Sequence, residues 1–427
     1  MDAAGAKQKD QAAVITSMII GQVILLGICN FFYALNRVGF PAGLSSVSRT
    51  YHFSVLQTTT LGTVFLLGQA LADIPVGYLV DRVSRKVLLF WGVMGIGATT
   101  ALFTFLTFNY STALIWRVLF GVTEGVTNIT LIATLGAMLP KRRGTLVSFN
   151  GASNALGSFV GPIGLALMIR SMGQWQMPLQ IFSVATAIWS IIILFVLRVS
   201  DKDFPAMAEH KKRMPVGEGL GKAMARLFKN LRFCSGLVIF VFNAVALWGF
   251  AGVGAYILAH YKGLSTVFAA TVLGTSYGIG GFGAPFVGYL SDKVGRWKPI
   301  LVIALLNVAS LAIMFCTPIV THWVLIVTGL VFGCGQSSIY YMGYSVVQDR
   351  VDLDQVGLAT GTTGAIGYLL GAFSGALIGF ITQSAGYVTA VYIVLIVPEL
   401  IVALGAIFVV APDERAKKAA IAASYAG

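Results

Sequence analysis

The feature that most constrains this chain is a series of long apolar runs spaced along its whole length. A helix needs roughly 20 mostly apolar residues to cross a hydrocarbon core about 30 Å thick, because each residue rises about 1.5 Å. Hydropathy within the runs is continuous and does not alternate, which excludes the strands of a membrane β-barrel. We find twelve such runs, at 14–38, 57–80, 87–107, 111–137, 146–169, 178–198, 234–258, 267–290, 299–319, 323–347, 357–381 and 387–411. The first run is too long for the core of a signal peptide, so we expect it to be retained. The sequence therefore predicts an all-α integral membrane protein with twelve transmembrane helices in a lipid bilayer.

Composition and the placement of cations agree with a membrane protein. Only 11% of the 427 residues are charged, against about 25% in a soluble domain. Of the 29 Lys and Arg residues, 24 lie at the termini or in every second connection, and three lie on the opposite side, at Arg49, Arg170 and Lys262. Because cytoplasmic loops collect cations, both termini are expected in the cytoplasm, with the protein in the cell (inner) membrane. Cations spread over many short loops mark topology, so we expect no nucleic-acid partner.

One long polar stretch divides the runs into six and six. We expect an N-terminal six-helix bundle at 1–198, a cytoplasmic linker at 199–232, and a C-terminal six-helix bundle at 233–427. An amphipathic segment near 218–232 is expected to lie along the inner membrane surface.

Two connections in corresponding places of the halves repeat each other. GYLVDRVSRK begins at Gly77 and GYLSDKVGRWK begins at Gly288, an offset of 211 residues. Each follows the second helix of its half, so the bundles are expected to be related by pseudo-two-fold symmetry about an axis along the membrane normal. Acidic and basic side chains of these loops could latch helices together on the inner face, and we assign gating to Asp81, Arg82, Arg85, Asp292 and Arg296.

With this duplicated loop and twelve runs, the chain resembles the major facilitator superfamily over essentially its whole length. One departure is Ser84, where the first copy of the loop usually has glycine; Gly295 keeps it in the second. The resemblance implies a cavity near the midplane and rocking between outward-open and inward-open states. We find no phosphate-binding loop, nucleophile–base pair or metal cluster, so neither a cofactor nor an enzyme is expected.

Charged residues inside the runs mark the candidate site, since each costs roughly 2.5–3.5 kcal/mol at the bilayer centre. Arg37 follows a polar and aromatic cluster near the outer half of the first run. It could clamp an anionic group with its forked guanidinium, or it could be an outer-interface arginine that reaches the headgroups. Arg117 and Glu124 lie seven residues apart on one face of the fourth run, about 10 Å apart. Glu124 falls near mid-membrane, where it could bind and release a proton, or could form a structural hydrogen bond to a neighbouring helix. Arg117, nearer the outer end, joins the gating residues.

Residues 117–162 narrow the resemblance to the anion:cation symporter branch of the family, whose members include galactonate, glucarate, phthalate and sialic-acid carriers. That branch pairs an arginine and a glutamate seven apart on helix four. It also usually carries an acidic residue followed by arginine on helix one, whereas this chain has Asn36-Arg37. The resemblance implies that Arg37 binds substrate and that Glu124 carries a proton, and the missing neighbouring carboxylate puts the proton stoichiometry in question.

Two other embedded carboxyls have less defined roles. For Asp73 we favour an interhelical hydrogen bond near the inner gate, with a second proton site as the alternative. For Glu399, on the peripheral last run, we favour a structural role. Neutral side chains that could bind substrate, or could merely join helices, are Tyr33, Asn36, Asn154, Gln336 and Tyr340.

These residues predict a secondary active transporter that moves a small organic anion, a carboxylate or a sugar acid, with protons or possibly sodium, acting as a monomer. The alternative on the same fold is an exporter of drugs or apolar metabolites by proton antiport. A receptor that has ceased to transport, or an intramembrane enzyme, is a third interpretation.

Overall fold

The computed structural model describes residues 3–80, 83–138, 143–199, 220–351 and 356–416, and its regular elements within these ranges are all helical. The first half contains α1 (Ala3–Tyr51), α2 (Val55–Thr63), α3 (Phe65–Leu79), α4 (Arg85–Leu106), α5 (Tyr110–Met138), α6 (Arg143–Met172) and α7 (Gln176–Val196). The second half contains α9 (Leu220–Lys229), α10 (Leu231–His260), α11 (Thr266–Tyr277), η2 (Gly280–Gly283), α12 (Ala284–Val294), α13 (Trp297–Leu311), η3 (Ala312–Cys316), α14 (His322–Gln348), α15 (Val356–Ala385), α16 (Tyr387–Val391), η5 (Tyr392–Ile396), α17 (Val397–Gly405) and η6 (Ala406–Val410).

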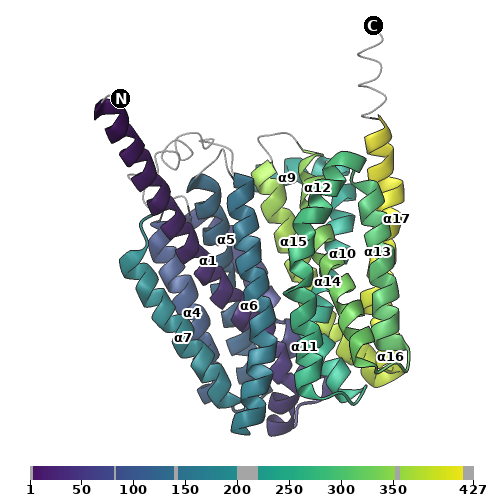
Figure 1. Ribbon diagram of the computed structural model, residues 1–427. Coiled ribbons are helices and arrows are strands. Elements are labelled where there is room, and N and C mark those ends of the chain that lie inside the picture. Colours follow the sequence, from purple (N-terminus) through teal and green to yellow (C-terminus); the bar gives the residue numbers. More distant parts are fainter. Residues whose placement is uncertain (1–2, 81–82, 139–142, 200–219, 352–355, 417–427) are drawn as a thin grey trace.

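Ten helical segments of the described part are long and apolar enough to cross a membrane. Two positions of a twelve-helix arrangement remain, and α5 and the broken pair α11–α12 occupy them. The prediction of an all-helical membrane protein is therefore confirmed. Figure 1 shows the long helices side by side, running between two faces of the molecule.

Two predicted spans differ from the structure. The first was expected to end at residue 38, but α1 continues through Pro41 to Tyr51. Small residues make this extension possible, since Gly39 packs directly on the backbone of Gly161 in α6. The eighth was expected to be continuous over 267–290, but it breaks between α11 and α12, where a glycine-rich stretch forms the 3-10 turn η2. Glycine lowers the stability of a helix interior, and hydropathy does not report this.

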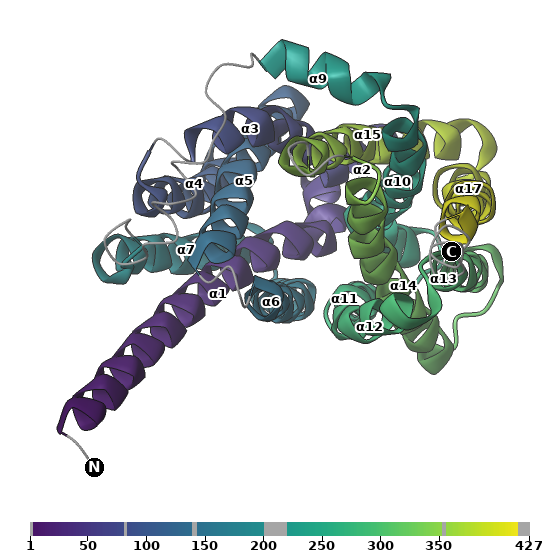
Figure 2. The same ribbon diagram turned by 90° about the horizontal axis from the view of Figure 1, so that it is seen from above.

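The helices gather into two groups, with α1 and α3 to α7 in one and α10 to α17 in the other (Figure 2). α2 leads directly into α3, belongs to the first group and lies where the groups meet. The groups meet where α2 and α3 pack against α15, α6 against α11, and α1 against α10. Near the face away from both ends of the described chain, Gly62 lies so close to the Gly252 carbonyl that a Cβ would not fit. Thr63 Oγ1 donates to Ala372 O (2.8 Å) and accepts from Gly375 N (3.2 Å). The two groups are therefore in close contact at this face.

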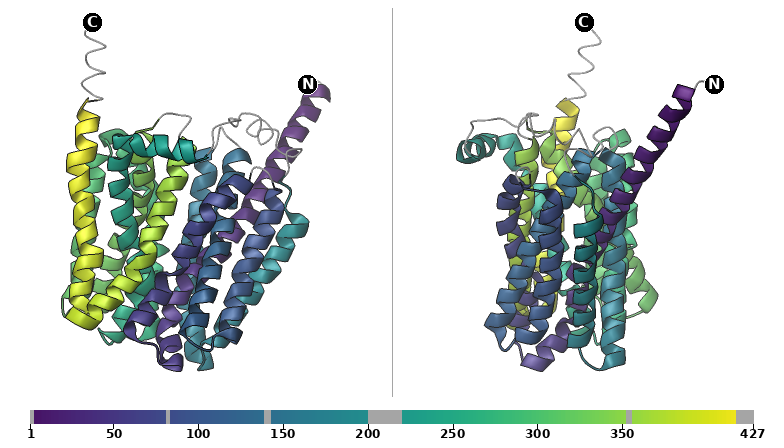
Figure 3. Two further views of the ribbon diagram at one scale, coloured as in Figure 1. Left: turned by 180° about the vertical axis from the view of Figure 1, so that it is seen from behind. Right: turned by 90° about the vertical axis from the view of Figure 1, so that its left-hand side faces the viewer.

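The opposite face carries both ends of the described chain. α1 begins there and the last helix ends there, as the front and rear views show (Figures 1 and 3). The amphipathic α9 lies across this face, and Met224 Sδ accepts a hydrogen bond from Thr362 of α15 (3.3 Å). Residues 200–219 of the expected linker lie outside the described ranges, so the domain bounds stay a prediction.

Candidate functional site

Arg37 lies in the interior of the molecule, near the middle of the span Ile19–Tyr51. Only 6% of the residue is exposed. Nη1 donates to the hydroxyl of Tyr33, one turn earlier on α1. The guanidinium carbon lies 4.0 Å from the ring centre of Trp248, and the rings of Phe65 and Tyr368 lie 5.3 and 5.7 Å away. The alternative of an arginine that reaches the headgroups does not agree with this burial: α1 extends thirteen residues beyond the expected end, so Arg37 lies near the middle of its span.

Glu124 faces Arg37 from α5. Its Oε2 lies 4.0 Å from Arg37 Nε, and the side chain is fully buried. Among the described residues, no donor forms a hydrogen bond to either carboxylate oxygen, and Arg37 Nη2 has no acceptor. The guanidinium of Arg37 and the carboxylate of Glu124 therefore compensate each other's charge. Arg37 Nη2 and both carboxylate oxygens of Glu124 remain without a hydrogen bond among the described residues.

The second half of the chain closes the site with aromatic side chains. Trp248 comes from α10, Tyr340 and Tyr344 from α14, and Tyr368 from α15. The Tyr340 hydroxyl lies 2.9 Å from that of Tyr368 and 3.4 Å from that of Tyr344. Tyr340 and Arg37 are close enough to interact electrostatically. The site is thus shared between the two helix groups.

α3 adds two polar residues that lie beside this site. Gln69 Nε2 donates to the Tyr33 hydroxyl at 3.4 Å, and its Oε1 has no partner among the described residues. Asp73 lies one turn farther along α3 and interacts electrostatically with Arg37 and Glu124. The sequence patterns did not single out Gln69, Trp248 or Tyr368 as site residues. Gln69 could have been found as a polar residue within the second apolar run. Nothing in the sequence distinguishes Trp248 from the other aromatic residues in the runs.

Two of the predicted substrate-binding residues on the first half point elsewhere. Asn36 precedes Arg37, so its side chain is turned about 100° around the helix. Its Nδ2 donates to Phe32 O and to Thr186 Oγ1 of α7, both at 2.9 Å. Asn154 of α6 donates to Asn30 Oδ1 at 3.4 Å. That Asn36 and Asn154 bind substrate therefore stays a prediction.

Gln336 belongs to a buried network inside the second group of helices. Its Oε1 accepts from Asn243 (2.6 Å), and its Nε2 donates to Glu399 Oε1 (2.6 Å). Asn307 donates to Glu399 Oε2 at 3.0 Å. These four side chains, all fully buried, connect α10, α13, α14 and α17. The favoured structural role of Glu399 agrees with this network.

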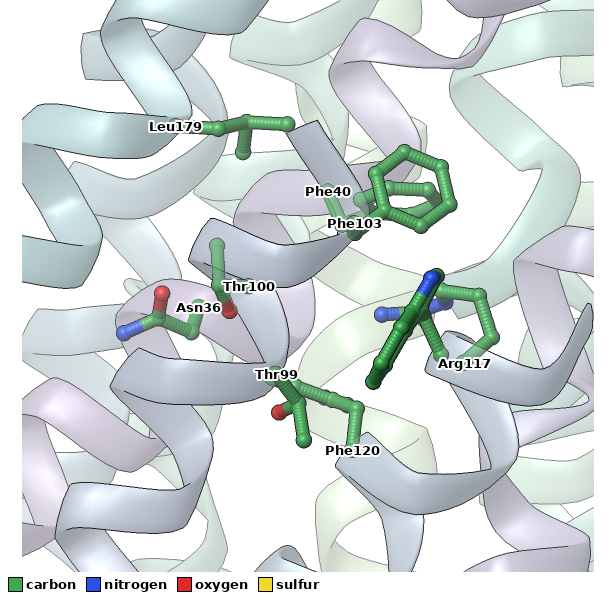
Figure 4. A pocket seen from close by; sticks show the side chains of 9 residues that line it. Asn36, Phe40, Thr99, Thr100, Phe103, Arg117, Phe120 and Leu179 are labelled. Atoms are coloured by element: carbon green, nitrogen blue, oxygen red, sulfur yellow. The ribbon is translucent and has the colours of Figure 1, made fainter. Parts of the chain in front are cut away.

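Arg117 lies two turns from Glu124 in a largely aromatic surrounding within the first group. Its guanidinium carbon lies 3.9 Å from the ring centre of Phe40, and Nε donates to Leu61 O at 3.2 Å. Figure 4 shows Arg117 across a small pocket from Asn36, with Phe40, Phe103 and Phe120 nearby. The cavity volume is about 10 Å³, which is room for about one water molecule.

The remaining predicted gating residues are only partly described. Asp81 and Arg82 lie outside the described residues, as does the side chain of Asp292, while Arg85 begins α4. Arg296 Nη1 forms an ion pair with Asp349 Oδ2 at 2.6 Å, at the C-terminal end of α14. The gating role of Arg296 and of the other residues in this set stays a prediction.

Comparison with known proteins agrees with this geometry. The family model described as Major Facilitator Superfamily matches residues 26–376. The hexuronate transporter of Bacillus subtilis is 24% identical over 389 residues, covering 85% of this chain and 87% of the transporter. Protein spinster homolog 1 of Xenopus tropicalis is 26% identical over 236 residues, which cover 53% of this chain but only 44% of that protein.

A solved structure gives the same fold. The inward-facing, unoccupied crystal structure of a bacterial homolog to human lysosomal transporter Spinster aligns with a TM-score of 0.71 at 16% identity, covering 92% of this chain and 96% of that one. The twelve-helix fold is therefore confirmed. The chain belongs to the major facilitator superfamily, and is a secondary transporter and not an enzyme.

Proposed function

We propose that this protein carries a small organic anion, a carboxylate or a sugar acid, across the cell (inner) membrane together with protons. Arg37 binds the carboxylate of the substrate, and Glu124 binds the proton. The observation that carries this proposal is the pairing of Arg37 Nε with Glu124 Oε2 at 4.0 Å in the buried centre of the site.

Charge compensation explains how the two ligands are coupled. In the empty site the two side chains offset each other, and a lone charge at this depth would cost several kcal/mol. When Glu124 takes up a proton, Arg37 loses its counter-charge and an anion can replace it. The empty and the fully loaded site are then both compensated, whereas a site with one ligand is not. This difference favours movement of the two ligands together.

Arg37 is suited to bind a carboxylate. Its Nη2 has no partner among the described residues, and Nε meets Glu124 only at 4.0 Å. Two free donors on one side of a guanidinium match the two oxygens of a carboxylate. The hexuronate transporter of Bacillus subtilis, named for a sugar acid, is among the relatives and supports this substrate class.

An exporter of drugs or apolar metabolites is the alternative on the same fold. The aromatic rings of Phe65, Trp248 and Tyr368 around Arg37 favour it, because they offer apolar contact area. A buried arginine is unfavourable for the cations that such exporters carry, so we place the anion carrier first.

The proposed orientation in the membrane and the proposed oligomeric state rest on the sequence. We propose that the face with the two ends and α9 is cytoplasmic, because 24 of 29 cations were assigned to that side. The proton is the proposed coupling ion, with sodium as the alternative, and the functional unit is a monomer.

Binding and transport test the proposal. The purified protein is screened by thermal shift against carboxylates, sulfonates, sugars and cationic drugs, and uptake of labelled D-glucuronate is measured in proteoliposomes with an acidic exterior. Arg37→Ala should weaken carboxylate binding roughly ten- to a hundredfold, the range for hydrogen bonds to a charged group. Glu124→Gln should lose accumulation against a gradient and keep exchange of labelled for unlabelled glucuronate.

Glu399→Gln is the matched control, because Glu399 is equally buried but lies outside the site. It should keep both accumulation and exchange. Accumulation by Glu124→Gln would rule out its role as proton carrier. Stabilisation only by apolar cations, unchanged in Arg37→Ala, would establish the exporter instead.

A further inference from the structure

Asp73 is a buried carboxyl that the coupling of Arg37 and Glu124 does not use. It lies on α3, one turn beyond Gln69 toward the inner end of the helix. Its Oδ1 is buried and accepts no hydrogen bond from any described residue. The same oxygen lies against Gly125, where a Cβ would stand only 3.0 Å away. Asp73 is therefore adjacent in space to the backbone that carries Glu124.

The groups that interact electrostatically with Asp73 come from four other helices, α1, α5, α14 and α15. α5 contributes Glu124 and α1 contributes Arg37, and both interact with Asp73 electrostatically. Tyr33, Tyr344 and Tyr368 also lie close enough to Asp73 to interact with it electrostatically. Asp73 thus belongs to the electrostatic surroundings of the site, on its cytoplasmic side.

The two carboxyls differ slightly in exposed area and in their place along the helices. Glu124 has no exposed surface, whereas 7% of Asp73 is exposed. With the outer side closed by α2 and α15, a proton that leaves Glu124 toward the cytoplasm needs an acceptor in that direction. Asp73 is the described carboxyl placed there.

Glu399 is a buried carboxyl of the same protein whose oxygens both accept hydrogen bonds, and it can be compared with Asp73 and Glu124. Both of its oxygens accept hydrogen bonds from amide groups, Oε2 from Asn307 (3.0 Å) and Oε1 from Gln336 (2.6 Å). Such donors stabilise the ionised form. Asp73 Oδ1 and both oxygens of Glu124 lack them among the described residues, and an unpartnered buried carboxylate is stabilised by taking up a proton.

We propose that Asp73 accepts the proton from Glu124 and passes it to the cytoplasm, as the inner station of the proton path; this rests on the function proposed above. In this step the O–H bond of protonated Glu124 breaks, and the proton forms an O–H bond with the Asp73 carboxylate, directly or through one water. Glu124 is left ionised, pairs again with Arg37 and displaces the bound anion. Protonated Asp73 then loses its proton to the cytoplasm.

The experiment uses the full chain in proteoliposomes with labelled D-glucuronate outside and a pH-sensitive dye inside. In Asp73→Asn, which keeps the size of the side chain but binds no proton, net uptake and proton arrival should fall together about a hundredfold, in the range lost when a proton-transfer group is removed. Exchange of labelled for unlabelled glucuronate at equal pH should be unchanged. Asp73→Glu should restore most of the net uptake, and Glu399→Gln should behave as wild type.

Two outcomes of this experiment overturn the proposal. Wild-type net uptake in Asp73→Asn would show that no proton passes through Asp73. Loss of exchange in parallel with net uptake would assign Asp73 to binding or structure.

A measurement without substrate separates this proposal from the anion carrier. pH-difference infrared spectra of the purified protein should show a carboxylic C=O band that is absent in Asp73→Asn and present in Glu124→Gln and Glu399→Gln. If that band is missing from the wild type, Asp73 does not exchange a proton and the proposal falls. If the band is present but no carboxylate binds or is carried, the anion carrier falls while Asp73 remains a proton-binding residue.

Discussion

At the scale of single residues, the site is defined by polar atoms that lack partners. Arg37 Nη2 and Trp248 Nε1 are buried donors without an acceptor among the described residues. A buried donor without a partner costs about 1–3 kcal/mol. The two belong to side chains that stack on each other, with 4.0 Å between the guanidinium carbon and the ring centre. A bound anion could accept from both.

Trp248→Phe tests this donor while keeping an aromatic ring next to Arg37. We expect carboxylate affinity to fall roughly fivefold, corresponding to the loss of one hydrogen bond worth about 1 kcal/mol. Trp248→Leu also removes the ring and should weaken binding further. Concentration series of the stabilising carboxylate in thermal-shift assays give the affinities. Equal affinity in wild type and Trp248→Phe would show that the indole N–H does not bind substrate.

At the scale of elements, a polar network fixes the packing of helices in the second group. Glu399 accepts from Asn307 of α13 and Gln336 of α14, and Gln336 accepts from Asn243 of α10. Glu399 itself lies on α17, between the π-helical turns η5 and η6. The network therefore joins four elements at one depth. Gln336 lies one turn before Tyr340 on α14, and its own contacts are with Asn243 and Glu399 of the second group.

Glu399→Leu removes the acceptor at the centre of this network. The amides of Asn307 and Gln336 would each lose a partner, at about 1–3 kcal/mol apiece, so the thermal midpoint in detergent should fall clearly. Glu399→Gln keeps one acceptor oxygen and should fall less. The order wild type, Gln, Leu is the expected ranking in thermal unfolding. A Leu variant as stable as wild type would show that the network adds nothing to stability.

At the scale of the whole molecule, the two helix groups meet closely on the face away from both ends of the described chain. Thr63 of α2 binds the backbone of α15 at Ala372 and Gly375. Several close contacts there involve glycine, including Gly62 with Gly252, so the surfaces meet at backbone distance. Apolar side chains also meet there, since Phe65 and Leu66 of α3 and Ala372 of α15 belong to one buried cluster. Separation of the two groups would expose this cluster.

A glycine replacement tests whether the close contact between α2 and α15 is needed. A Cβ at position 375 would overlap Thr59 O and lie 2.5 Å from Thr63 Oγ1, so Gly375→Ala should prevent α2 and α15 from meeting as closely as they do here. We expect uptake to fall, because a transport cycle that passes through this structure needs the contact. Gly361→Ala on the same helix, where the added Cβ meets no atom within 4 Å, is the control and should transport as wild type. Wild-type uptake by Gly375→Ala would show that the close contact between α2 and α15 is not needed for transport.

The sequence by itself predicts the membrane-spanning helices of this protein and the charged residues at its centre. Apolar length and charge placement predict spans and orientation, because the bilayer penalises polar groups along every span in the same way. That penalty also singled out Arg37, Glu124, Asp73 and Glu399, because it depends on depth in the bilayer and not on packing. The repeated loop at Gly77 and Gly288 indicated two related halves, since it recurs at the same place in each.

Only the tertiary structure decided which side chains meet. Helical periodicity places Tyr340 and Gln336 on one face of α14, yet Tyr340 contacts the site and Gln336 turns to Glu399. Helical periodicity does not predict that Trp248 packs against the Arg37 guanidinium, because the two residues lie about 210 positions apart in the chain. Hydropathy reports how deeply a residue can lie. Which neighbour it meets there depends on the packing of helices distant in sequence, and in this protein close contacts at glycine decide that packing.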